Sequence, residues 1–563
     1  MMKFCDIVSR VVSTVVLCVV WVPIGYGQIK VWKSPSSNNP IVTSQWEVND
    51  LVYKVKRKVE KPFLKEVFAR VEGGQKEQRI PLFYNGNNEW VFRYSSAEIG
   101  DKHFAIESDI KGLNGIAGKI IVTENKKTGR HGGIVLNKEK PRDFFHEDGT
   151  HYFNLAFECD WLFALDYPQE DLAKTTHLLS LIKANGYNQI VMNVYAYGLD
   201  LDWVKDEGLK KNPQHNYGCR EDIFPFLGSN EHPDYSSLNI DFFKHLDRVI
   251  SKMHDYDIVS HLMIYVWNKR VSWPALGSEA DDMYYKHVIE RYQAFPNIVW
   301  DVSKEAASKI AFAQNKNIVE HLIERAQMTR ALDAYGRLLT VHDFGFCKNH
   351  KEWVDFISIQ NWKLDLYDLM LKAYKEFPDK PVFNIEHGGY EESPYAIFPG
   401  GYSNAEYCLR RNYLCLFAGV YTTYYWQGTS WNAIIHNPFE QGSDVKKPHF
   451  EYFKYMRSLF NQVNYENFEP VTKFNSRSYN LTNYKDGMIL LYVPKEVHHA
   501  DIKNQLDNEF NYDSATCQWF NTLTGEFTPE EKVEFKHKYG FWDWRPWRNQ
   551  ADAIYVIRGL EKK

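Results

Sequence analysis

Apolar and polar residues follow one pattern up to about residue 130 and another beyond it. In the first stretch they alternate in short runs, which turn sequences such as Asn85-Gly86-Asn87 separate. A period of two is typical of β-strands with one buried face, and about 100 residues of this kind suit a β-sandwich. We predict a β-sandwich over residues 28–135. Its expected strands are Leu51–Val55, Glu66–Val71, Trp90–Tyr94, His103–Ser108 and Lys119–Thr123.

From about residue 140, short apolar runs alternate with longer amphipathic stretches. This alternation is typical of βα units around a parallel sheet, and eight such units suit a (β/α)8 barrel. We predict this barrel over residues 136–465. A doubly wound open sheet is the alternative, which no G-x-G-x-x-G or Walker sequence supports. The expected strands are Tyr152–Phe157, Gln189–Tyr195, Ile258–Val266, Asn297–Val302, Leu338–His342, Phe356–Gln360, Pro381–Ile385 and Val420–Trp426. The expected helices are Glu170–Asn185, Asp241–His254, Ala280–Ala294, Asn317–Leu332, Leu364–Phe377, Ala405–Ala418 and Phe450–Val463.

After about residue 466 the short alternating runs return. We predict a C-terminal β-sandwich over residues 466–563. The expected fold class is therefore multidomain, with a central (β/α)8 TIM barrel flanked by an N-terminal and a C-terminal β-sandwich. The expected C-terminal strands are Ser478–Asn480, Met488–Val493, Ala515–Phe520 and Ile554–Ile557.

The first 27 residues have the features of an export signal. Lys3 and Arg10 supply positive charge, residues 11–22 form an apolar run, and Gly25 and Gly27 supply small residues before a cleavage site. The apolar run is short for a membrane span. We expect cleavage after Gly27 and export to the periplasm or the extracellular space, without a stable membrane anchor. An uncleaved anchor helix is the alternative.

Net charge and cysteine spacing limit the classes of protein. The formal net charge of −5 is small for 563 residues, and we find no basic block, so nothing predicts a nucleic-acid partner. The cysteines after the signal form no C-x-x-C pair, which indicates neither a zinc site nor a dense disulfide framework, although one or two disulfides fit an exported protein. These cysteines are Cys159, Cys219, Cys347, Cys408, Cys415 and Cys517.

In a (β/α)8 barrel the catalytic groups stand where the strands end. There this chain places carboxylates and aromatic residues, and it has no H-x-H or H-E-x-x-H sequence. Glu305 follows the fourth expected strand and Glu386 the seventh, so the two face each other across the barrel mouth. Cleavage of a glycosidic bond needs two carboxyl groups in such an arrangement. We predict Glu305 and Glu386 as the catalytic pair, with no metal and no cofactor.

Both strand ends resemble a known family. Val299-Trp300-Asp301-Val302-Ser303-Lys304-Glu305-Ala306 is similar to the strand-four motif of clan A, the retaining (β/α)8 glycosidases, and Phe383-Asn384-Ile385-Glu386-His387-Gly388 is similar to its strand-seven motif. The resemblance implies that Glu305 is the acid/base and Glu386 the nucleophile. It also implies that Trp426 is a platform under the sugar, and that His342 lies where several members carry a strand-five histidine.

The resemblance extends over nearly all of the mature chain. The chain looks like a group of bacterial exported glycosidase-like proteins that have an N-terminal β-sandwich, a barrel and a C-terminal β-domain. Its stretch Gln518-Trp519-Phe520-Asn521 through Gly525 resembles a recurring feature of that C-terminal domain. Two positions depart from the clan pattern. Lys304 replaces an Asn that binds the sugar 2-hydroxyl, and Gln360 or Asn361 stands where many members have a Tyr. Lys304 could donate a hydrogen bond, meet a sulfate or carboxylate of the substrate, or lower the pKa of Glu305.

These observations favour a retaining O-glycoside hydrolase that cleaves a plant or algal polysaccharide or oligosaccharide by double displacement. Lys304 and the Lys269-Arg270 loop hint at an anionic substrate. The alternatives are a carbohydrate-binding protein that has lost catalysis on a glycosidase scaffold, and a polysaccharide lyase. The residues expected to bind substrate are Trp426, His342, Lys304, Asn193, His387 and Asn361.

Overall fold

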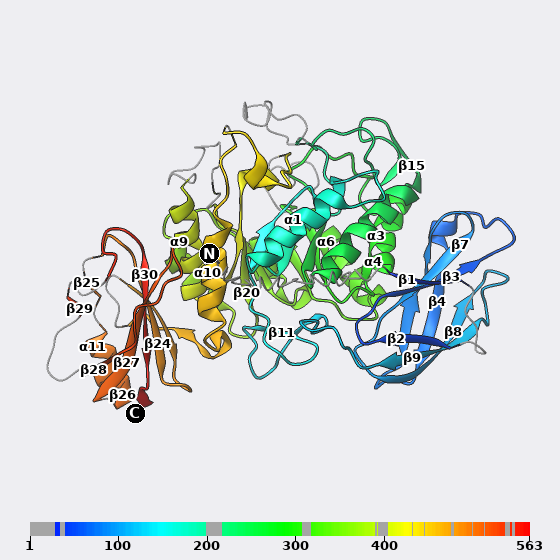
Figure 1. Cartoon of the computed structure of the whole chain (residues 1–563). Helices are drawn as coiled ribbons and strands as arrows, with labels where there is room; N and C mark the ends of the chain where they lie inside the picture. Colours follow the sequence, from blue (N-terminus) through cyan, green and yellow to red (C-terminus); the bar gives the residue numbers. More distant parts are fainter. Residues whose placement is uncertain are drawn as a thin grey trace, which may run out of the picture.

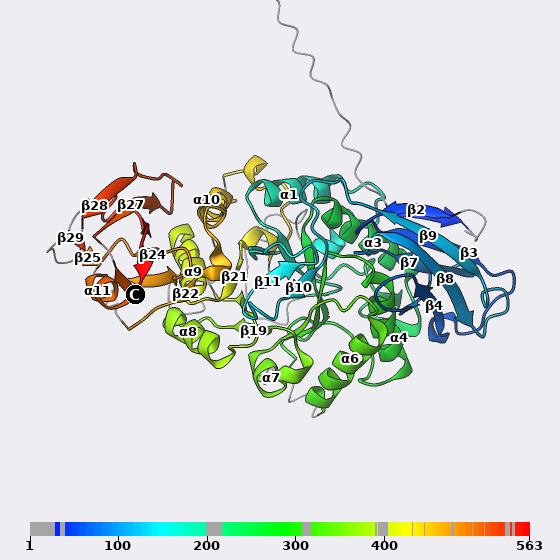
Figure 2. The same cartoon turned by 90° about the horizontal axis from the view of Figure 1, so that it is seen from below.

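The computed structural model describes residues 29–563 apart from 34–39, 199–214, 216, 307–316, 389–390, 392–403, 431, 444, 474–477, 498, 501, 512, 535–540 and 543–545. An N-terminal β domain, a central barrel and a C-terminal β domain lie in a row (Figure 1). The view from below shows the same row (Figure 2). This architecture confirms the predicted multidomain fold. The predicted signal peptide, residues 1–27, lies outside the described residues.

The N-terminal domain is a sandwich of two sheets around a core that includes Leu51, Phe92, Phe104 and Ile106. One sheet has the order β1 (Lys30–Lys33), β3 (Asn49–Lys54), β7 (Glu89–Tyr94) and β6 (Phe83–Tyr84). The other has the order β2 (Ile41–Ser44), β9 (Ala117–Thr123), β8 (Gly100–Ser108), β4 (Val67–Glu72) and β5 (Gln78–Pro81).

Burial along these strands explains why the sequence pattern finds them. Strand β9 alternates between buried and less buried positions, as a strand with one face on the core must. Strand β7 is buried at five of its six positions. Its second face is covered because Arg93, on β7, reaches the barrel and donates to Asp247 over 3.0 Å.

Eight parallel strands form the central barrel in the order β18-β17-β16-β13-β12-β21-β20-β19. Between the two end strands, the backbone of Asp355 donates to Leu339 O over 2.8 Å and its carboxylate accepts from Leu339 N. These contacts nearly close the barrel. The strands are β12 (Ala156–Glu158), β13 (Gln189–Asn193), β16 (Val259–Val266), β17 (Ile298–Lys304), β18 (Leu339–His342), β19 (Ile357–Gln360), β20 (Val382–Glu386) and β21 (Tyr421–Tyr424).

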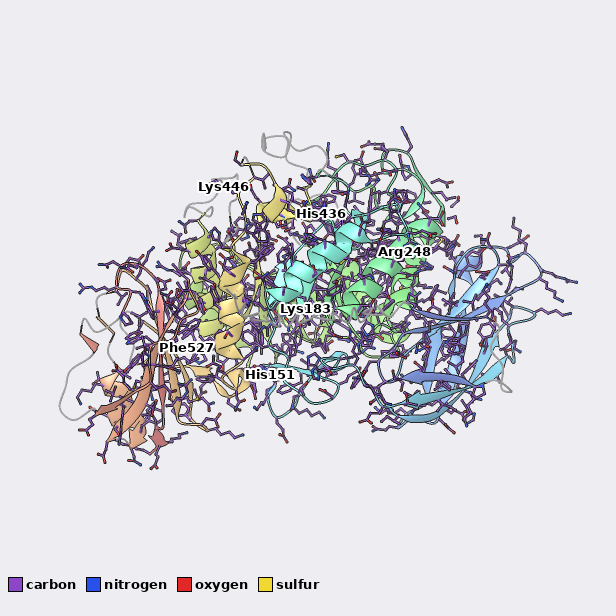
Figure 3. The ribbon with its side chains drawn as sticks, viewed as in Figure 1. His151, Lys183, Arg248, His436, Lys446 and Phe527 are labelled. Atoms are coloured by element: carbon purple, nitrogen blue, oxygen red, sulfur yellow. The ribbon has the colours of Figure 1, made fainter. Side chains whose placement is uncertain are left out.

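Capping residues mark where several of the barrel helices start. Asn239, Ser278 and Asn404 each accept a hydrogen bond from backbone N–H groups of the first turn. In Figure 3, Lys183 in the last turn of the first helix lies lower than His436, which follows β21, so the strands end on the upper side. The helices are α1 (Ala173–Ala184), α3 (Ile240–Asp255), α4 (Glu279–Tyr292), α6 (Ile318–Leu332), α7 (Phe344–Asn349), α8 (Leu366–Glu376), α9 (Ala405–Phe417) and α10 (Phe450–Phe460).

The six-stranded sheet of the C-terminal domain is antiparallel, in the order β22-β23-β24-β30-β27-β28. Its residues alternate between two cores: Leu490 and Tyr492 of β24 pack on the barrel side, whereas Ile489 and Leu491 pack on the opposite side with Leu506. Both faces are therefore buried. The strands are β22 (Glu469–Pro470), β23 (Tyr479–Asn483), β24 (Met488–Val493), β27 (Ser514–Asn521), β28 (Glu531–Glu534) and β30 (Ala553–Arg558), and Leu506 lies on helix α11 (Lys503–Glu509).

Several details differ from the sequence expectations. The six-residue helix α7 and the hairpin of β14 (Phe226–Gly228) with β15 (Pro233–Leu238) were not expected, because elements this short carry no periodic pattern. All six cysteines after the signal are free thiols, so the disulfides considered for them do not form. Within the described part of the chain, no helix is long and apolar enough to cross a membrane.

Candidate active site

The carboxyl ends of the barrel strands bring together the residues expected to act in catalysis. Both predicted catalytic residues stand beside an irregularity in the sheet. The pairing of β17 with β18 shifts register between Asp301 and Lys304, directly before Glu305. The pairing of β19 with β20 shifts so that Gln360 lies opposite Glu386. Such irregularities re-aim side chains next to active sites.

Glu305 has a backbone conformation that is rare for its residue type. Its φ is 56°, in the left-handed region where a side chain is strained. Its carboxylate oxygen Oε1 accepts hydrogen bonds from Asn268 over 3.1 Å and from Gln360 over 3.0 Å. The side chain is partly exposed. Strain held in place by surrounding contacts is typical of functional positions.

Glu386 is buried at the end of β20, with 5% of its surface exposed. Its Oε2 lies 3.6 Å from Lys304 Nζ and 3.6 Å from His342 Nε2. Burial and the neighbouring Lys304 and His261 lower the pKa of His342 well below its usual value, so this imidazole is neutral at pH 7. Among the described residues, Lys304 is therefore the charged group of opposite sign that the structure places beside Glu386.

Lys304 contacts more than one carboxylate. Its Nζ lies 3.2 Å from Glu158, 3.5 Å from Asp160 and 3.6 Å from Glu386. Burial opposes the charged form, but these carboxylates raise the pKa of Lys304 well above its usual value. The lysine is therefore a buried ammonium whose charge the protein itself compensates. Its predicted role in substrate binding stays a prediction.

Glu158 is the last residue of the first barrel strand, β12, and Asp160 follows that strand; both are buried. Burial and the adjacent Asp160 raise the pKa of Glu158 to about 8, against the opposing effect of Lys304. Ser430 Oγ donates to Glu158 over 3.1 Å. Lys269, also buried, lies 3.5 Å from Asp160. In the sequence, Lys269 suggested an anionic substrate. Its ion pair with Asp160 inside the protein is a second explanation for a lysine at this position.

Asp301 supports the site from a deeper position, where it is fully buried. Its carboxylate accepts hydrogen bonds from His342 N over 2.9 Å and Ser303 N over 3.1 Å, and lies 3.0 Å from His261 Nε2. These contacts fix the end of β17 against β18 where the register shifts. They hold the two backbone segments that carry Glu305 and His342.

The other predicted binding residues differ in their surroundings. Asn193 is fully buried, and neither polar atom of its amide has a hydrogen-bond partner among the described residues. The backbone N–H of Asn361 donates to Glu386 O over 2.9 Å. Trp426 is fully buried, with its ring edge-to-face against Phe450 at a centroid distance of 6.3 Å.

His387 lies next to Glu386 in sequence but its side chain contacts a different part of the barrel. Its Nε2 lies 2.7 Å from the carbonyl oxygen of Thr423. Burial and the nearby Arg411 lower its pKa to about 3, so it is neutral. The ring therefore packs between β20 and β21, and its predicted contact with substrate stays a prediction.

Sequence reasoning left several residues out of the predicted site. Glu158 and Asp160 had a usable signal, since both follow an expected barrel strand. Asn268, one of the two amides on Glu305, had little signal beyond its place near a strand end. Gln360, the other amide, was named only because it or Asn361 stands where many clan members have a Tyr. Among the described residues, no group of three or more His, Cys, Asp or Glu side chains is arranged to hold a metal ion.

Comparison with known proteins adds a family and a set of similar folds. A family profile described as an apiosidase-like catalytic domain matches residues 138–467. A protein from Bacteroides vulgatus ATCC 8482 assigned as a glycoside hydrolase is 18% identical over 92% of this chain and 100% of that one, with a TM-score of 0.71. A family 5 glycoside hydrolase from the same organism is 18% identical over 76% of this chain and 94% of that one, with a TM-score of 0.55. No curated protein matches the chain.

Proposed function

We propose that this glycoside hydrolase, which belongs to the family of apiosidase-like catalytic domains, cleaves O-glycosidic bonds of plant or algal polysaccharides or oligosaccharides with retention of configuration. The observation that carries the proposal is the pair of strand-end glutamates. One is buried against a cation, and the other is held by two neutral amides. The family name makes an apiosidic bond the first linkage to test. The predicted signal favours action outside the cytoplasm.

Glu386 is the nucleophile in this proposal. An attacking carboxylate must be ionised, and an opposite charge nearby favours the ionised form. Lys304 supplies that charge at 3.6 Å, while the neutral His342 adds none. Glu386 attacks the anomeric carbon, and the bond to the leaving oxygen breaks as a glycosyl-enzyme ester forms.

Glu305 is the acid/base. It gives its proton to the leaving oxygen in the first step and takes a proton from water in the second. Asn268 and Gln360 donate to the same oxygen, Oε1, and so orient the carboxyl group without adding charge. No step of this mechanism requires a metal or a cofactor.

Substrate binding in the proposal involves the remaining predicted residues. Asn193 is the most suitable, because its buried amide has donor and acceptor capacity that the described residues do not use. Sugar hydroxyls can satisfy both groups. Lys304, His342, Asn361, His387 and Trp426 complete the proposed binding set.

The test is to compare Glu386→Gln and Glu305→Gln with the exposed control Glu352→Gln on a panel of plant and algal glycans that includes apiosides. We expect Glu386→Gln to lose at least about 10⁴-fold in kcat. Glu305→Gln should keep turnover of an aryl glycoside whose leaving group needs no proton, and NMR should show retained anomeric configuration. Near wild-type activity of Glu386→Gln, or an inverted first product, would refute the assignment. Binding without hydrolysis of any glycan would favour the carbohydrate-binding alternative.

A further inference from the structure

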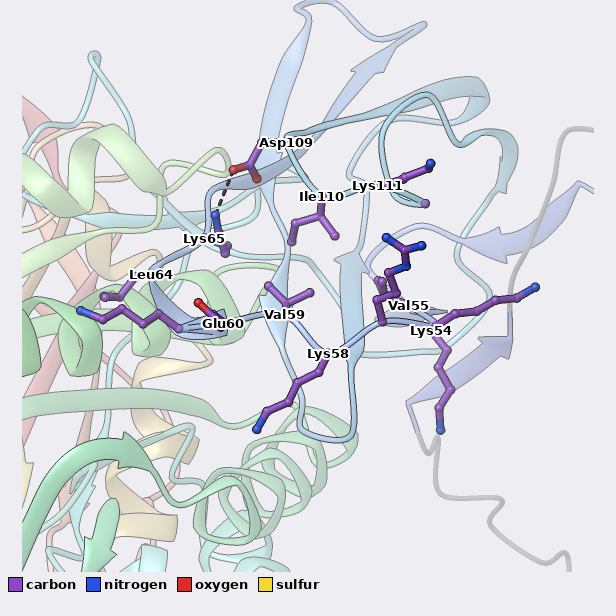
Figure 4. Close-up of a pocket in the computed structure, with 14 residues that line it drawn as sticks. Lys54, Val55, Lys58, Val59, Glu60, Leu64, Lys65, Asp109, Ile110 and Lys111 are labelled. Atoms are coloured by element: carbon purple, nitrogen blue, oxygen red, sulfur yellow. Dashed lines mark hydrogen bonds and ion pairs between the residues drawn. The ribbon is translucent and has the colours of Figure 1, made fainter.

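A basic pocket lies on the N-terminal sandwich, outside the barrel site. Residues 54–61 and 64–65, which follow β3, line one side, and residues 109–112, which follow β8, line the other. Its volume is about 900 Å³. Figure 4 shows Lys54, Lys58 and Lys111 extending from these segments, and the ion pair of Lys65 with Asp109. We call this set of residues the basic pocket.

Charge distinguishes the basic pocket from the rest of the protein. Seven Lys or Arg and two acidic residues line it, so its net charge is +5. Residues 28–135 carry 18 Lys and Arg against 12 Asp and Glu, although the whole chain has a net charge of −5. The expectation that the chain has no basic block is therefore wrong for residues 54–65, which hold six Lys or Arg and one Glu. This loop is short and lies between two expected strands whose alternating pattern is clearer than its own.

Protein carboxylates compensate only part of this charge. Lys61 and Lys65 form ion pairs of 3.0 Å with Glu279 and Asp109, and Lys54 lies 3.7 Å from Glu89. Among the described residues, the other four cations of the basic pocket form no ion pair. Neighbouring cations repel one another, and together they create a positive potential that attracts anions. The uncompensated cations are Lys56, Arg57, Lys58 and Lys111, and all four are exposed.

The chemistry of the lining favours an acidic polysaccharide over a single-stranded nucleic acid. The apolar part of the basic pocket is aliphatic, with Val55, Val59, Leu64 and Ile110. Single-stranded nucleic acids are bound by aromatic side chains on which bases stack, and the lining of this pocket has none. Carboxylate or sulfate groups repeated along a glycan need only spaced cations, which the pocket supplies.

The position of the basic pocket connects it to the barrel mouth. Lys61 pairs with Glu279, the first residue of α4. Helices of a (β/α)8 barrel begin at the end where the strands finish, which is also the end that carries the active site. Phe63 packs edge-to-face on His287 of α4 at 5.4 Å, so the loop is fixed on the barrel. A glycan held in the pocket would thus lie on the side of the molecule that faces the proposed catalytic residues.

We infer that the basic pocket binds acidic polysaccharide, through its carboxylate or sulfate groups, and retains the substrate chain near the barrel mouth. This inference rests on the proposed function for the identity of the ligand as a glycan. The benefit is kinetic: a chain tethered at one site has a raised effective concentration at the other. The pocket takes no part in bond cleavage.

The test compares two full-length triple variants that change the net charge equally. The pocket variant is Lys56→Glu, Arg57→Glu and Lys58→Glu. The control variant is Lys33→Glu, Lys76→Glu and Lys126→Glu, three exposed lysines of the same domain. Affinity electrophoresis and calorimetry measure binding to polygalacturonate, to a sulfated carrageenan, to fully methyl-esterified pectin and to duplex DNA. We expect the pocket variant to bind polygalacturonate or carrageenan at least about tenfold more weakly than the control variant, at low salt where charge matters most.

Comparing polygalacturonate with carrageenan shows whether carboxylate or sulfate groups are recognised. Fully methyl-esterified pectin should bind the wild type, the pocket variant and the control variant equally weakly. Equal losses in the pocket and control variants would overturn the inference, and so would a preference for duplex DNA that only the pocket variant loses. Hydrolysis of a small uncharged glycoside should be the same in all three proteins. If the proposed function fails, the wild-type protein will not hydrolyse any glycan, and the binding comparison still decides the inference.

Discussion

Lys304 occupies the position before the proposed acid/base, where the clan pattern has Asn. The sequence suggested an effect on Glu305, but in the structure Lys304 contacts Glu158, Asp160 and Glu386. A buried cation favours the ionised form of a neighbouring carboxylate, although burial and Asp160 outweigh this effect at Glu158. The replacement therefore supports the proposed nucleophile, Glu386, more directly than it weakens the proposed acid, Glu305. It is compatible with catalysis for that reason.

We predict that Lys304→Met will shift the pH dependence of catalysis. Without the ammonium group, Glu386 ionises less readily, so the acidic limb of the kcat/KM profile should move up by about one pH unit or more. At pH 5 we expect a loss of at least about tenfold in kcat/KM. Lys269→Met is the matched control, because Lys269 contacts Asp160 but has no ion pair with Glu386. A profile that falls in height without moving would contradict this role for Lys304.

Glu158 gives a second prediction, which concerns stability. Burial and the adjacent Asp160 raise its pKa to about 8 in the folded protein, from an ordinary value of 4.5. Between these pH values the folded state keeps a proton that the unfolded state releases. Its stabilising effect is complete below about pH 4.5 and is lost as the pH rises through about 8. Glu158→Gln mimics the protonated acid, so we expect wild type to lose about 4 kcal/mol relative to this variant between pH 5 and 9.

Urea unfolding at several pH values measures this difference. Glu139→Gln, at an exposed position, should show no such pH dependence relative to wild type. A constant difference between wild type and Glu158→Gln across the pH range would show that Glu158 is ionised in the folded protein.

At the scale of single residues, the sequence predicted which residue types stand at the strand ends better than it predicted which side chains contact one another. Glu305 and Glu386 were named because each follows an apolar strand, a local property. The approach of Lys304 to Glu158 depends on the closure of the sheet, which brings the side chains of the first and fourth barrel strands, β12 and β17, together. No local sequence pattern contains this information. His387 illustrates the same limit, since neighbouring residues at the end of β20 face different surroundings.

Elements were predicted well where they are long and periodic. All eight barrel strands lie where expected, although the first is only three residues, Ala156–Glu158. The register shifts beside Glu305 and Glu386 could not be predicted, because they depend on pairing between strands. Helix α7 was not predicted because it is short. It contacts both β18 and β19, the two strands at the ends of the sheet order.

The turn that follows β20 allows a prediction about an element. Gly388 has a φ of 77°, and a Cβ atom there would lie 2.7 Å from the Trp362 ring. Gly388→Ala therefore combines backbone strain with a clash, and we expect a cost of about 2–4 kcal/mol in unfolding free energy. Glu386 lies two residues away, so kcat should also fall by at least about tenfold.

Gly277→Ala is the control for backbone strain alone. Its φ is 71°, and a Cβ atom there would meet nothing within 4 Å. We expect it to cost about 1 kcal/mol with unchanged kcat. Denaturant unfolding and steady-state kinetics on both variants separate the two effects. Equal costs would show that Trp362 moves aside freely.

At the scale of the whole molecule, buried ion pairs join the sandwich to the barrel. Arg93 of the sandwich donates to Asp50 of its own domain over 2.7 and 2.8 Å and to Asp247 of α3 over 3.0 Å. Arg291 of α4 donates to the same Asp247 over 2.8 and 2.7 Å. Two guanidinium groups and two carboxylates thus form one buried network, so each charge has an opposite partner.

Arg93→Met should break this network and reduce the cooperativity of unfolding. Removing one member of a buried set leaves carboxylates without compensation, at a cost of about 3–5 kcal/mol. We expect calorimetry to show the sandwich unfolding before the barrel, where wild type unfolds the two together. Lys30→Met, which removes an exposed pair with Glu47 of 2.7 Å, should cost under about 1 kcal/mol.

The same network predicts how the joined domains respond to acid. Burial opposes the charged form of Asp247, but Arg291 and Arg93 lower its pKa to about 2 from an ordinary value of 3.8. The ionised form is therefore favoured in the folded state, and its contribution of about 2 kcal/mol is present above about pH 4 and lost as the pH falls through about 2. The difference in unfolding free energy between wild type and the double variant Arg93→Met/Asp247→Asn should shrink between pH 5 and pH 2. A difference that stays constant over this range would show that Asp247 does not carry the charge that holds the sandwich on the barrel.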